Sequence, residues 1–153
     1  MHQRTHLNRT GGFSFIEVMM VMAVLVLLAG LAIPFYQSFQ VSSGLDNTTR
    51  EVASALRRTQ GLAMGSQQWS AWGVHIGTHQ YVIFPGTVYN PSEPKNEIFT
   101  IPQSITLSSS AGADIVFSRI KGETANAGTL TLQTVNNEAA SITINQRGII
   151  NVQ

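Results

Sequence analysis

Residues 11–36 read GGFSFIEVMMVMAVLVLLAGLAIPFY, and this stretch decides the fold. It is an almost unbroken apolar run that follows a Gly-Gly pair and carries one carboxylate, Glu17, near its start. Between Glu17 and Asp46 there is no Asp, Glu, Lys or Arg. Counted over residues 13–33, the run would form a helix about 30 Å long, which matches the hydrocarbon core of a membrane. The sequence therefore predicts a membrane-length helix with a charge close to one end.

Composition places this run in an otherwise polar chain. Charged residues make up 11% of the sequence, whereas roughly 25% is usual for a soluble domain. The net charge of +1 gives no sign of a binder of nucleic acid or other polyanions. The sequence contains no cysteine, which excludes disulfides, thiolate metal sites and cysteine nucleophiles. Stability must therefore come from core burial and from packing against other subunits.

The residues before the run favour a cytoplasmic N-terminus. Residues 1–12 contain two arginines, two histidines and no acid, and basic flanks of this kind remain in the cytoplasm. A conventional secretory signal with a cleavage site at 30–32, a plain single-pass anchor, and a segment cut before its helix all fit this pattern. The first two do not explain Glu17, because an ionised carboxylate on a membrane helix is costly without a partner. A protonated Glu17, or one that reaches the headgroups, is the simplest alternative.

The motif GGFSFIEVMMVMAVLVLLAGLAIPFYQSF, residues 11–39, resembles the N-terminus of type IV pilins and type II secretion pseudopilins. The resemblance implies that a prepilin peptidase cuts between Gly12 and Phe13 and then methylates the amine of Phe13. Glu17 matches the family glutamate five residues into the mature chain, which implies a role in filament assembly and register. Pro34 matches the proline that kinks the helix in this family.

The helix is expected to continue beyond the apolar run. Pro34 lacks a backbone donor and should bend the helix, with Gly30 adding flexibility, although Pro34 could instead end the membrane segment. Beyond it a stripe at helical spacing continues, which favours a kink: Val41, Leu45, Thr48, Val52, Leu56, Thr59 and Ala63. The sequence thus predicts a hydrophobic transmembrane or filament-core helix over 13–39 and an amphipathic half over 40–66, closed at Gly65-Ser66.

Charged residues fall mostly off this stripe. A solvated helix face is favoured over a binding patch for the whole set: Asp46, Arg50, Glu51, Arg57 and Arg58.

After Gln68 the apolar period changes from helical to alternating. Short strands are expected over 72–76, 81–84, 98–101, 105–107, 115–118, 129–134, 142–145 and 149–152. Asn136-Asn137 is a turn signal between two Thr-rich alternating runs. The predicted fold class is α+β, with a small, mainly antiparallel sheet in a head over 67–153 that packs on the helix.

The head also resembles the GspH/FimT-like branch of minor pilins and minor pseudopilins. The pieces that carry this resemblance include YVIFPG, IVFSRIKGETANAGTLTL and the terminal ITINQRGII. Many major pilins close a C-terminal loop with a disulfide, so the absence of cysteine favours a minor subunit or a pseudopilin.

No catalytic motif is present, so we expect no enzymatic activity, cofactor or metal. His75 and His79 are four residues apart, but they straddle a strand end and a turn, which disfavours a metal site. Trp69, Trp72 and Tyr81 could form a stacking platform for DNA or sugar, but core packing is the favoured interpretation.

DNA binding is an alternative that the resemblance raises. Some FimT-like minor pilins bind DNA through a C-terminal Gly-Arg-x-Arg element, whereas this chain ends in QRGIINVQ with Arg147 alone. With Arg119 and Lys121 the head offers only a sparse basic patch for weak contact with DNA. Nucleic acid is therefore not the favoured partner.

The sequence favours a structural subunit of a type IV pilus or a type II secretion pseudopilus. Its expected partners are prepilin peptidase, other pilin or pseudopilin subunits, the inner-membrane assembly platform, and membrane lipid before assembly. The expected location is a single pass in the inner membrane with the head exported, followed by the filament. The alternatives are a DNA-binding minor pilin for natural transformation and a secreted β-rich domain with an ordinary signal peptide.

Overall fold

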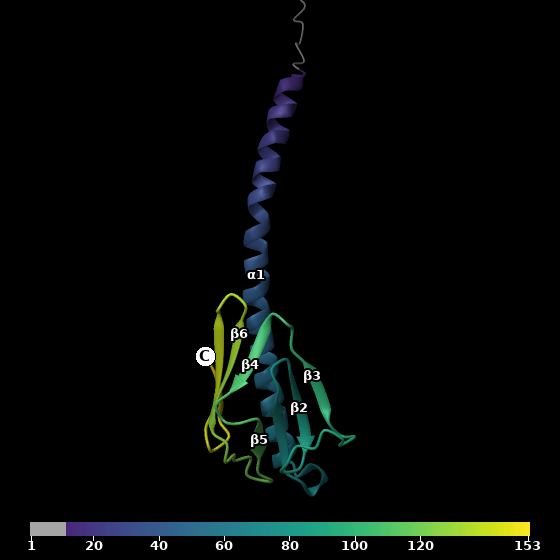
Figure 1. The fold of residues 1–153 in the computed structure, drawn as a ribbon, viewed down its shortest axis with the longest axis vertical. Coiled ribbons are helices and arrows are strands. Elements are labelled where there is room, and N and C mark those ends of the chain that lie inside the picture. The colour runs from purple at the N-terminus through teal and green to yellow at the C-terminus, as the bar shows by residue number, and fades with distance from the viewer. Residues whose placement is uncertain (1–11) are drawn as a thin grey trace, which may run out of the picture. The chain divides into compact units, whose positions relative to one another are not determined.

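The structure is a computed structural model that describes residues 12–153, with the backbone alone described for 31–41. The chain divides after Phe39 into two compact units, and each is described by itself. The first unit contains the first half of the long helix α1 (Phe15–Met64), and the second unit, Gln40–Gln153, contains its second half and the head (Figure 1).

All eight strands expected from the sequence are present, with small differences at their ends. The elements after α1 are the 3-10 helix η1 (Gln67–Trp69) and the strands β1 (Trp72–Ile76), β2 (Gln80–Pro85), β3 (Glu97–Thr100), β4 (Ile105–Ser109), β5 (Asp114–Phe117), β6 (Gly128–Thr134), β7 (Ala139–Ile144) and β8 (Ile150–Val152). The turn at Asn136-Asn137 joins β6 to β7, and Asn137 adopts a left-handed backbone with φ of 63°. Asparagine tolerates this conformation, which explains the residue type at the turn.

The strands form two four-stranded sheets in which every pairing is antiparallel: β3-β2-β1-β5 and β4-β6-β7-β8. This confirms the α+β class and the antiparallel head, but the expectation of one sheet is wrong. Alternation identifies strands without fixing their partners. Here β4 pairs with β6, with Leu107 opposite Leu132, and does not continue the first sheet.

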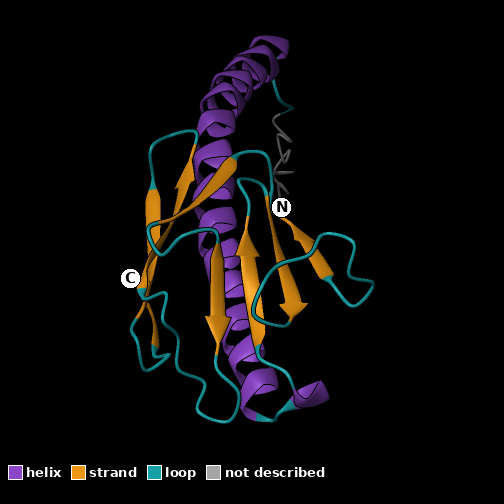
Figure 2. Ribbon diagram, turned by 60° about the horizontal axis from the view of Figure 1, so that its bottom comes forward, coloured by secondary structure: helices purple, strands orange, loops and turns teal. Residues whose placement is uncertain are grey.

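The second half of α1 and both sheets share one hydrophobic core, and the strands of both sheets lie along the helix (Figure 2). The buried helix positions are Leu45, Thr48, Thr49, Val52, Ala53, Ala55, Leu56, Thr59 and Ala63. At 3.6 residues per turn these positions span about 160° of the circumference, wider than a one-sided stripe of about 100°. The small side chains of Ala53 and Ala55 lie at the two edges of this arc. A helix that contacts two sheets needs such a broad buried face.

The buried threonines on α1 satisfy their hydroxyl groups locally. Thr59 donates to the carbonyl oxygen of Ala55 at 2.8 Å, and Thr49 donates to that of Leu45 at 2.7 Å. Because the hydroxyl of each is paired within its own helix, threonine can occupy a core position without an unsatisfied polar group.

Candidate functional site

The predicted cleavage site lies just before α1. Gly12 and Phe13 precede the helix, and both are exposed. The basic leader before Gly12, residues 1–11, lies outside the described residues.

Glu17 lies in the first turn of α1 and is exposed. The carbonyl oxygen of Ser14 accepts hydrogen bonds from the backbone N–H of Glu17 at 3.0 Å and of Val18 at 3.2 Å. Ser14 therefore occupies the N-cap position and Glu17 the third helical position, the spacing of a capping box. A carboxylate here also interacts favourably with the helix dipole, by roughly 0.3–1 kcal/mol. The Ser-x-x-Glu spacing was readable in the sequence, and it places Glu17 at the position that the glutamate of a capping box occupies.

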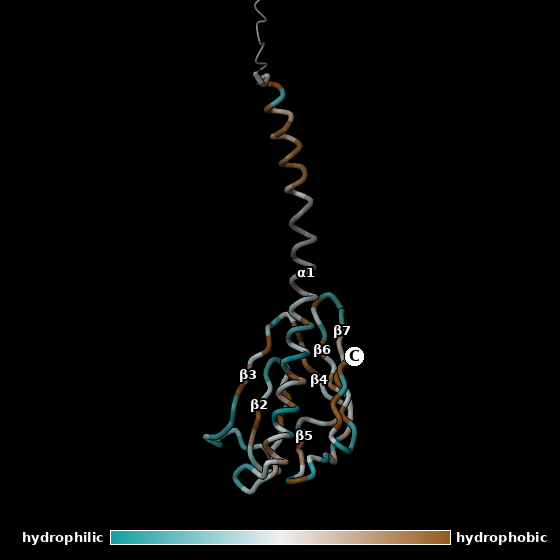
Figure 3. The backbone as a smooth tube through the Cα atoms, turned by 180° about the vertical axis from the view of Figure 1, so that it is seen from behind, coloured by the Kyte–Doolittle hydropathy of each residue, from teal (hydrophilic) through white to brown (hydrophobic). Residues whose placement is uncertain are grey.

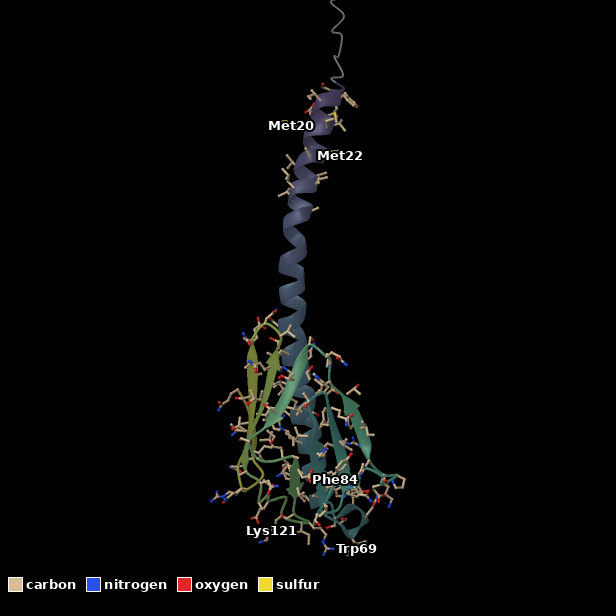
Figure 4. All side chains as sticks on the ribbon, viewed as in Figure 1. Met20, Met22, Trp69, Phe84 and Lys121 are labelled. Carbon is tan, nitrogen blue, oxygen red and sulfur yellow. The ribbon has the colours of Figure 1, made fainter. Side chains whose placement is uncertain are left out.

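The first half of α1 exposes large apolar side chains on all sides. The backbone of this part of the helix is coloured mostly as hydrophobic in Figure 3, and Met20 and Met22 are labelled in Figure 4. The set comprises Phe15, Ile16, Val18, Met19, Met20, Val21, Met22, Val24, Leu25, Val26, Leu27 and Leu28. A helix that is apolar all round belongs in a membrane or inside an assembly.

Over the part of the chain whose side chains are described, no helix is long and apolar enough to span a membrane. The segment predicted to do so, 13–39, extends into residues 31–39, whose side chains lie outside that part. The backbone of α1 continues through Pro34 to Met64, so the alternative that Pro34 ends the helix is wrong. The kink expected at Gly30 and Pro34 stays a prediction.

The charged residues on the second half of α1 are all exposed, as their spacing predicted. Arg58 donates two hydrogen bonds to the Glu97 carboxylate on β3 at 2.6 and 2.8 Å, which raises the pKa of Arg58 above its ordinary value. Arg50 pairs with Asp46 one helical turn away at 3.0 Å. Exposed pairs of this kind contribute about 0–1 kcal/mol.

The three basic residues considered for DNA contact lie on two adjoining loops. Arg119 and Lys121 are in the loop between β5 and β6, and Arg147 is in the loop between β7 and β8. Thr124 donates its backbone N–H to the carbonyl oxygen of Gln146 at 3.0 Å, which joins the two loops. None of the ion pairs found among the described residues includes any of these three cations.

Gln60 on α1 fixes both loops. Its side-chain amide donates to the carbonyl oxygens of Gly122 and Gly148, each at 3.0 Å. Gly148 has φ of 78°, and a Cβ atom there would overlap with the Gly122 carbonyl oxygen and the Gln60 amide nitrogen. The glycine of the QRGII segment is thus required by close backbone approach, which sequence reasoning did not detect.

The three aromatic residues do not act together. Trp72 is 5% exposed and Tyr81 is 1% exposed, as core packing predicted. For Trp69 that prediction is wrong, since its side chain is 82% exposed. Trp69 lies in η1 with a left-handed backbone, which carries it out of the alternating pattern of β1. The Tyr81 hydroxyl donates to Glu51 at 3.2 Å, and burial, followed by the charge of Glu51, raises the pKa of Tyr81.

The two histidines make separate contacts. His75 Nδ1 lies 2.6 Å from the Asp114 carboxylate, and its ring stacks on Tyr89 with centroids 4.0 Å apart. His79 Nδ1 lies 3.1 Å from the carbonyl oxygen of Ile105.

Two solved structures resemble this fold. The minor pseudopilin EpsH from the type 2 secretion system of Vibrio cholerae matches with a TM-score of 0.56 and 15% identity, over 71% of this chain and 95% of its own. The type IV minor pilin FimU of Pseudomonas aeruginosa matches with a TM-score of 0.55 and 14% identity, over 71% of this chain and 92% of its own. No family model and no curated protein matches the sequence. At these identities the likeness shows the fold, which is that of the type IV pilins and pseudopilins.

Proposed function

We propose that the chain is a structural subunit, a minor pilin or pseudopilin, of a type IV pilus or a type II secretion pseudopilus. Prepilin peptidase removes residues 1–12 and methylates Phe13. The apolar helix then holds the subunit in the inner membrane, surrounded by lipid, with the head exported. Assembly by the inner-membrane platform moves this helix from lipid into a filament core formed with other subunits.

One observation carries the proposal. The first half of α1 exposes apolar side chains on every side, while every buried apolar side chain among the described residues lies between Leu45 and Ile150. Among the described residues, the hydrophobic core of the head is thus formed by residues of the second unit. At about 25 cal/mol per Å² of apolar surface, leaving that helix in water is strongly unfavourable. Lipid and neighbouring helices are the environments that would cover it, and the fold shared with EpsH and FimU supports the second.

Glu17 supplies register in this proposal. After cleavage Phe13 carries a cationic amine, and the carboxylate of Glu17 can pair with the amine of a neighbouring subunit. At about 4 Å and an effective dielectric constant near 20, such a pair gains about 4 kcal/mol before desolvation is subtracted. Apolar contacts between helices have little directionality, so the ion pair is what fixes the axial position.

The processing step is tested by the intact mass of the protein extracted from membranes, with and without prepilin peptidase. The expected product lacks residues 1–12 and carries one added methyl group. A chain that begins near Ile33, or an unprocessed chain in the presence of the peptidase, would overturn the proposal.

The assembly step is tested with two variants of Glu17. Glu17→Gln keeps an N3 side chain that can complete the capping box but removes the charge, whereas Glu17→Ala removes both. We expect both variants to insert in the membrane and both to lose incorporation into sheared filaments. If Glu17→Gln is incorporated like the parent chain while Glu17→Ala is not, Glu17 acts as a helix cap and the ion-pair argument is wrong.

A further inference from the structure

One end of the head carries an exposed apolar and cationic surface, which we call the Trp69 surface. It is formed by Met64 at the end of α1, Trp69 in η1, and the loop residues Arg119, Ile120 and Lys121. Trp69 is 82%, Ile120 63% and Met64 49% exposed. Trp69 and Lys121 are labelled in Figure 4 at this end of the head.

Direct contacts join the two chain segments that carry these side chains. Arg119 donates to the carbonyl oxygen of Trp69 at 3.2 Å, and its guanidinium carbon lies 5.8 Å from the centre of the indole ring. The backbone N–H of Ile120 donates to the carbonyl oxygen of Ala63 at 3.2 Å. The loop backbone is thus joined to the end of α1, and the Arg119 side chain is joined to η1.

The backbone beneath this surface is strained. Five non-glycine residues have positive φ among residues 12–153, and four of them lie here: Ser66, Gln68, Trp69 and Ile120. Ile120, at φ of 71°, is β-branched and therefore a strong outlier. Strain of this kind costs about 1–3 kcal/mol per residue and concentrates at functional sites. In this head it accompanies the exposure of two large apolar side chains that would otherwise be expected in the core.

The charge of the surface is unbalanced. The ion pairs among the described residues lie elsewhere, and neither Arg119 nor Lys121 takes part in one. The same loop, residues 118–127, contains one carboxylate, Glu123. Trp, Met and Arg are enriched in protein interfaces, and Trp and Arg dominate binding energy there. The composition therefore fits a protein partner that offers an apolar recess with a carboxylate at its rim, whereas so few cations suit a polyanion poorly.

The head itself contains a recess of that description, between α1 and the strands β2 and β3. Its volume is about 240 Å³, and its apolar wall includes Ala55, Ile83 and the stacked rings of Tyr81 and Phe99. Its charged lining residues are Glu51, which accepts the Tyr81 hydroxyl, and Arg58, which is paired with Glu97. Because Glu97 balances the charge of Arg58, the charge left over at the recess is the negative one of Glu51.

We propose that the Trp69 surface of one head docks into the Glu51 recess of a second copy, with Lys121 and Arg119 facing Glu51. The two surfaces are different parts of the head, so the contact is heterologous and can repeat along an open chain. This contact rests on the proposed function and deepens it, since it would join two copies of the subunit within a filament. A high local concentration of heads in the filament would compensate for a weak contact.

The test uses the head, residues 40–153, which retains every buried apolar side chain found among the described residues. Because the sequence has no cysteine, a single cysteine can be placed on each surface. Ser54 lines the recess, so Ser54→Cys reports on it. Glu123→Cys, at an exposed position of the 118–127 loop, reports on the Trp69 surface and leaves its five residues unchanged. Mixed and oxidised, these variants should form a 54–123 cross-link faster than Ser54→Cys mixed with Ser108→Cys, an exposed position on β4. Equal rates for the two mixtures would overturn the proposal.

Two further comparisons test the chemistry of the contact. Trp69→Ala in the Glu123→Cys chain should abolish the preference for the 54–123 cross-link, whereas Val135→Ala, at an exposed valine in the β6–β7 turn, should preserve it. In sedimentation of single heads, Lys121→Glu should weaken association by about three- to tenfold. Mixing Lys121→Glu with Glu51→Lys should restore it, and no recovery would overturn the pairing of these two groups.

Nucleic acid is the competing occupant. A fluorescent single-stranded 20-mer should show no Trp69-dependent retention in the buffer used for cross-linking. Retention that Trp69→Ala removes, without a preferred cross-link, would overturn the proposal in favour of a nucleic-acid site. Correct processing at Gly12 with no preferred cross-link would refute this inference alone. Absence of processing would refute the proposed function, and the cross-linking experiment would still decide whether the head contact exists.

Discussion

Gly148→Ala is expected to destabilise the head more strongly than any other glycine substitution considered below. The added Cβ overlaps with the Gly122 carbonyl oxygen and the Gln60 amide nitrogen, and the backbone is left-handed with φ of 78°. A side chain at position 148 is therefore unfavourable for two separate reasons, one steric and one conformational.

The magnitude follows from three contributions. The left-handed conformation costs about 1–2 kcal/mol for a residue with a Cβ atom. Relief of the overlap separates the loops from Gln60, whose two hydrogen bonds at 3.0 Å contribute about 1 kcal/mol each. The lower entropy of alanine in the unfolded chain offsets about 0.4–1 kcal/mol. The free energy of unfolding should therefore fall by about 3 kcal/mol, a large part of the 5–15 kcal/mol typical of a domain.

Urea denaturation of residues 40–153, followed by tryptophan fluorescence, measures this change. Gly112→Ala is the matched control, because Gly112 also has a positive φ, of 94°, but no atom lies within 4 Å of an added Cβ. It should lose about 1 kcal/mol, from the backbone alone. Gly44→Ala, in open space on α1, should be neutral or stabilising by up to about 1 kcal/mol. If Gly148→Ala loses no more than Gly112→Ala, the loops relax freely and the account of Gln60 as their anchor is wrong.

Three further predictions concern the same unit. Leu56→Ala, at a fully buried position of the hydrophobic core, should lower the free energy of unfolding by about 2–5 kcal/mol. A loss below about 1 kcal/mol in urea denaturation would contradict a core built around this helix. Tyr81→Phe should flatten the alkaline limb of the plot of unfolding free energy against pH. Burial raises the folded pKa of Tyr81. The stability that the hydroxyl contributes is therefore complete below the unfolded pKa of about 10 and is lost as pH rises from there towards the folded pKa. An unchanged alkaline limb in Tyr81→Phe, measured by urea denaturation between pH 9 and about 11, would show that this hydroxyl is not the group that titrates. Glu97→Gln should lower the free energy of unfolding by less than about 1 kcal/mol, because the ion pair of Glu97 with Arg58 is exposed. A fall in melting temperature that corresponds to a greater loss would show that solvent does not screen this pair.

Much of the head could be predicted because its signals are local. A strand needs only a few alternating residues to be recognised, and all eight expected strands are present. The buried stripe on α1 was likewise readable from spacing, including the threonines, since a hydroxyl bonded to its own helix behaves as a core group. The broader arc was not predicted, because Ala53 and Ala55 become buried only when two sheets flank the helix.

The candidate sites divide in the same way. The motif around Gly12, Phe13 and Glu17 is contiguous in the sequence, so its resemblance could be stated before any fold was known. The capping-box spacing of Ser14 and Glu17 was equally local and was overlooked. By contrast, the exposure of Trp69 depends on left-handed backbone in η1 and on Arg119, fifty residues away.

The sequence by itself determined the change of period after residue 68, the strands, the apolar run and the single charge within it. These features are properties of short segments, where side-chain spacing decides which face can be buried. The tertiary structure decided how the strands divide between two sheets, why Gly148 must be glycine, and where the Trp69 surface and the Glu51 recess lie. Each of those depends on contacts between residues far apart in the chain, whose proximity is fixed only when the core closes around α1.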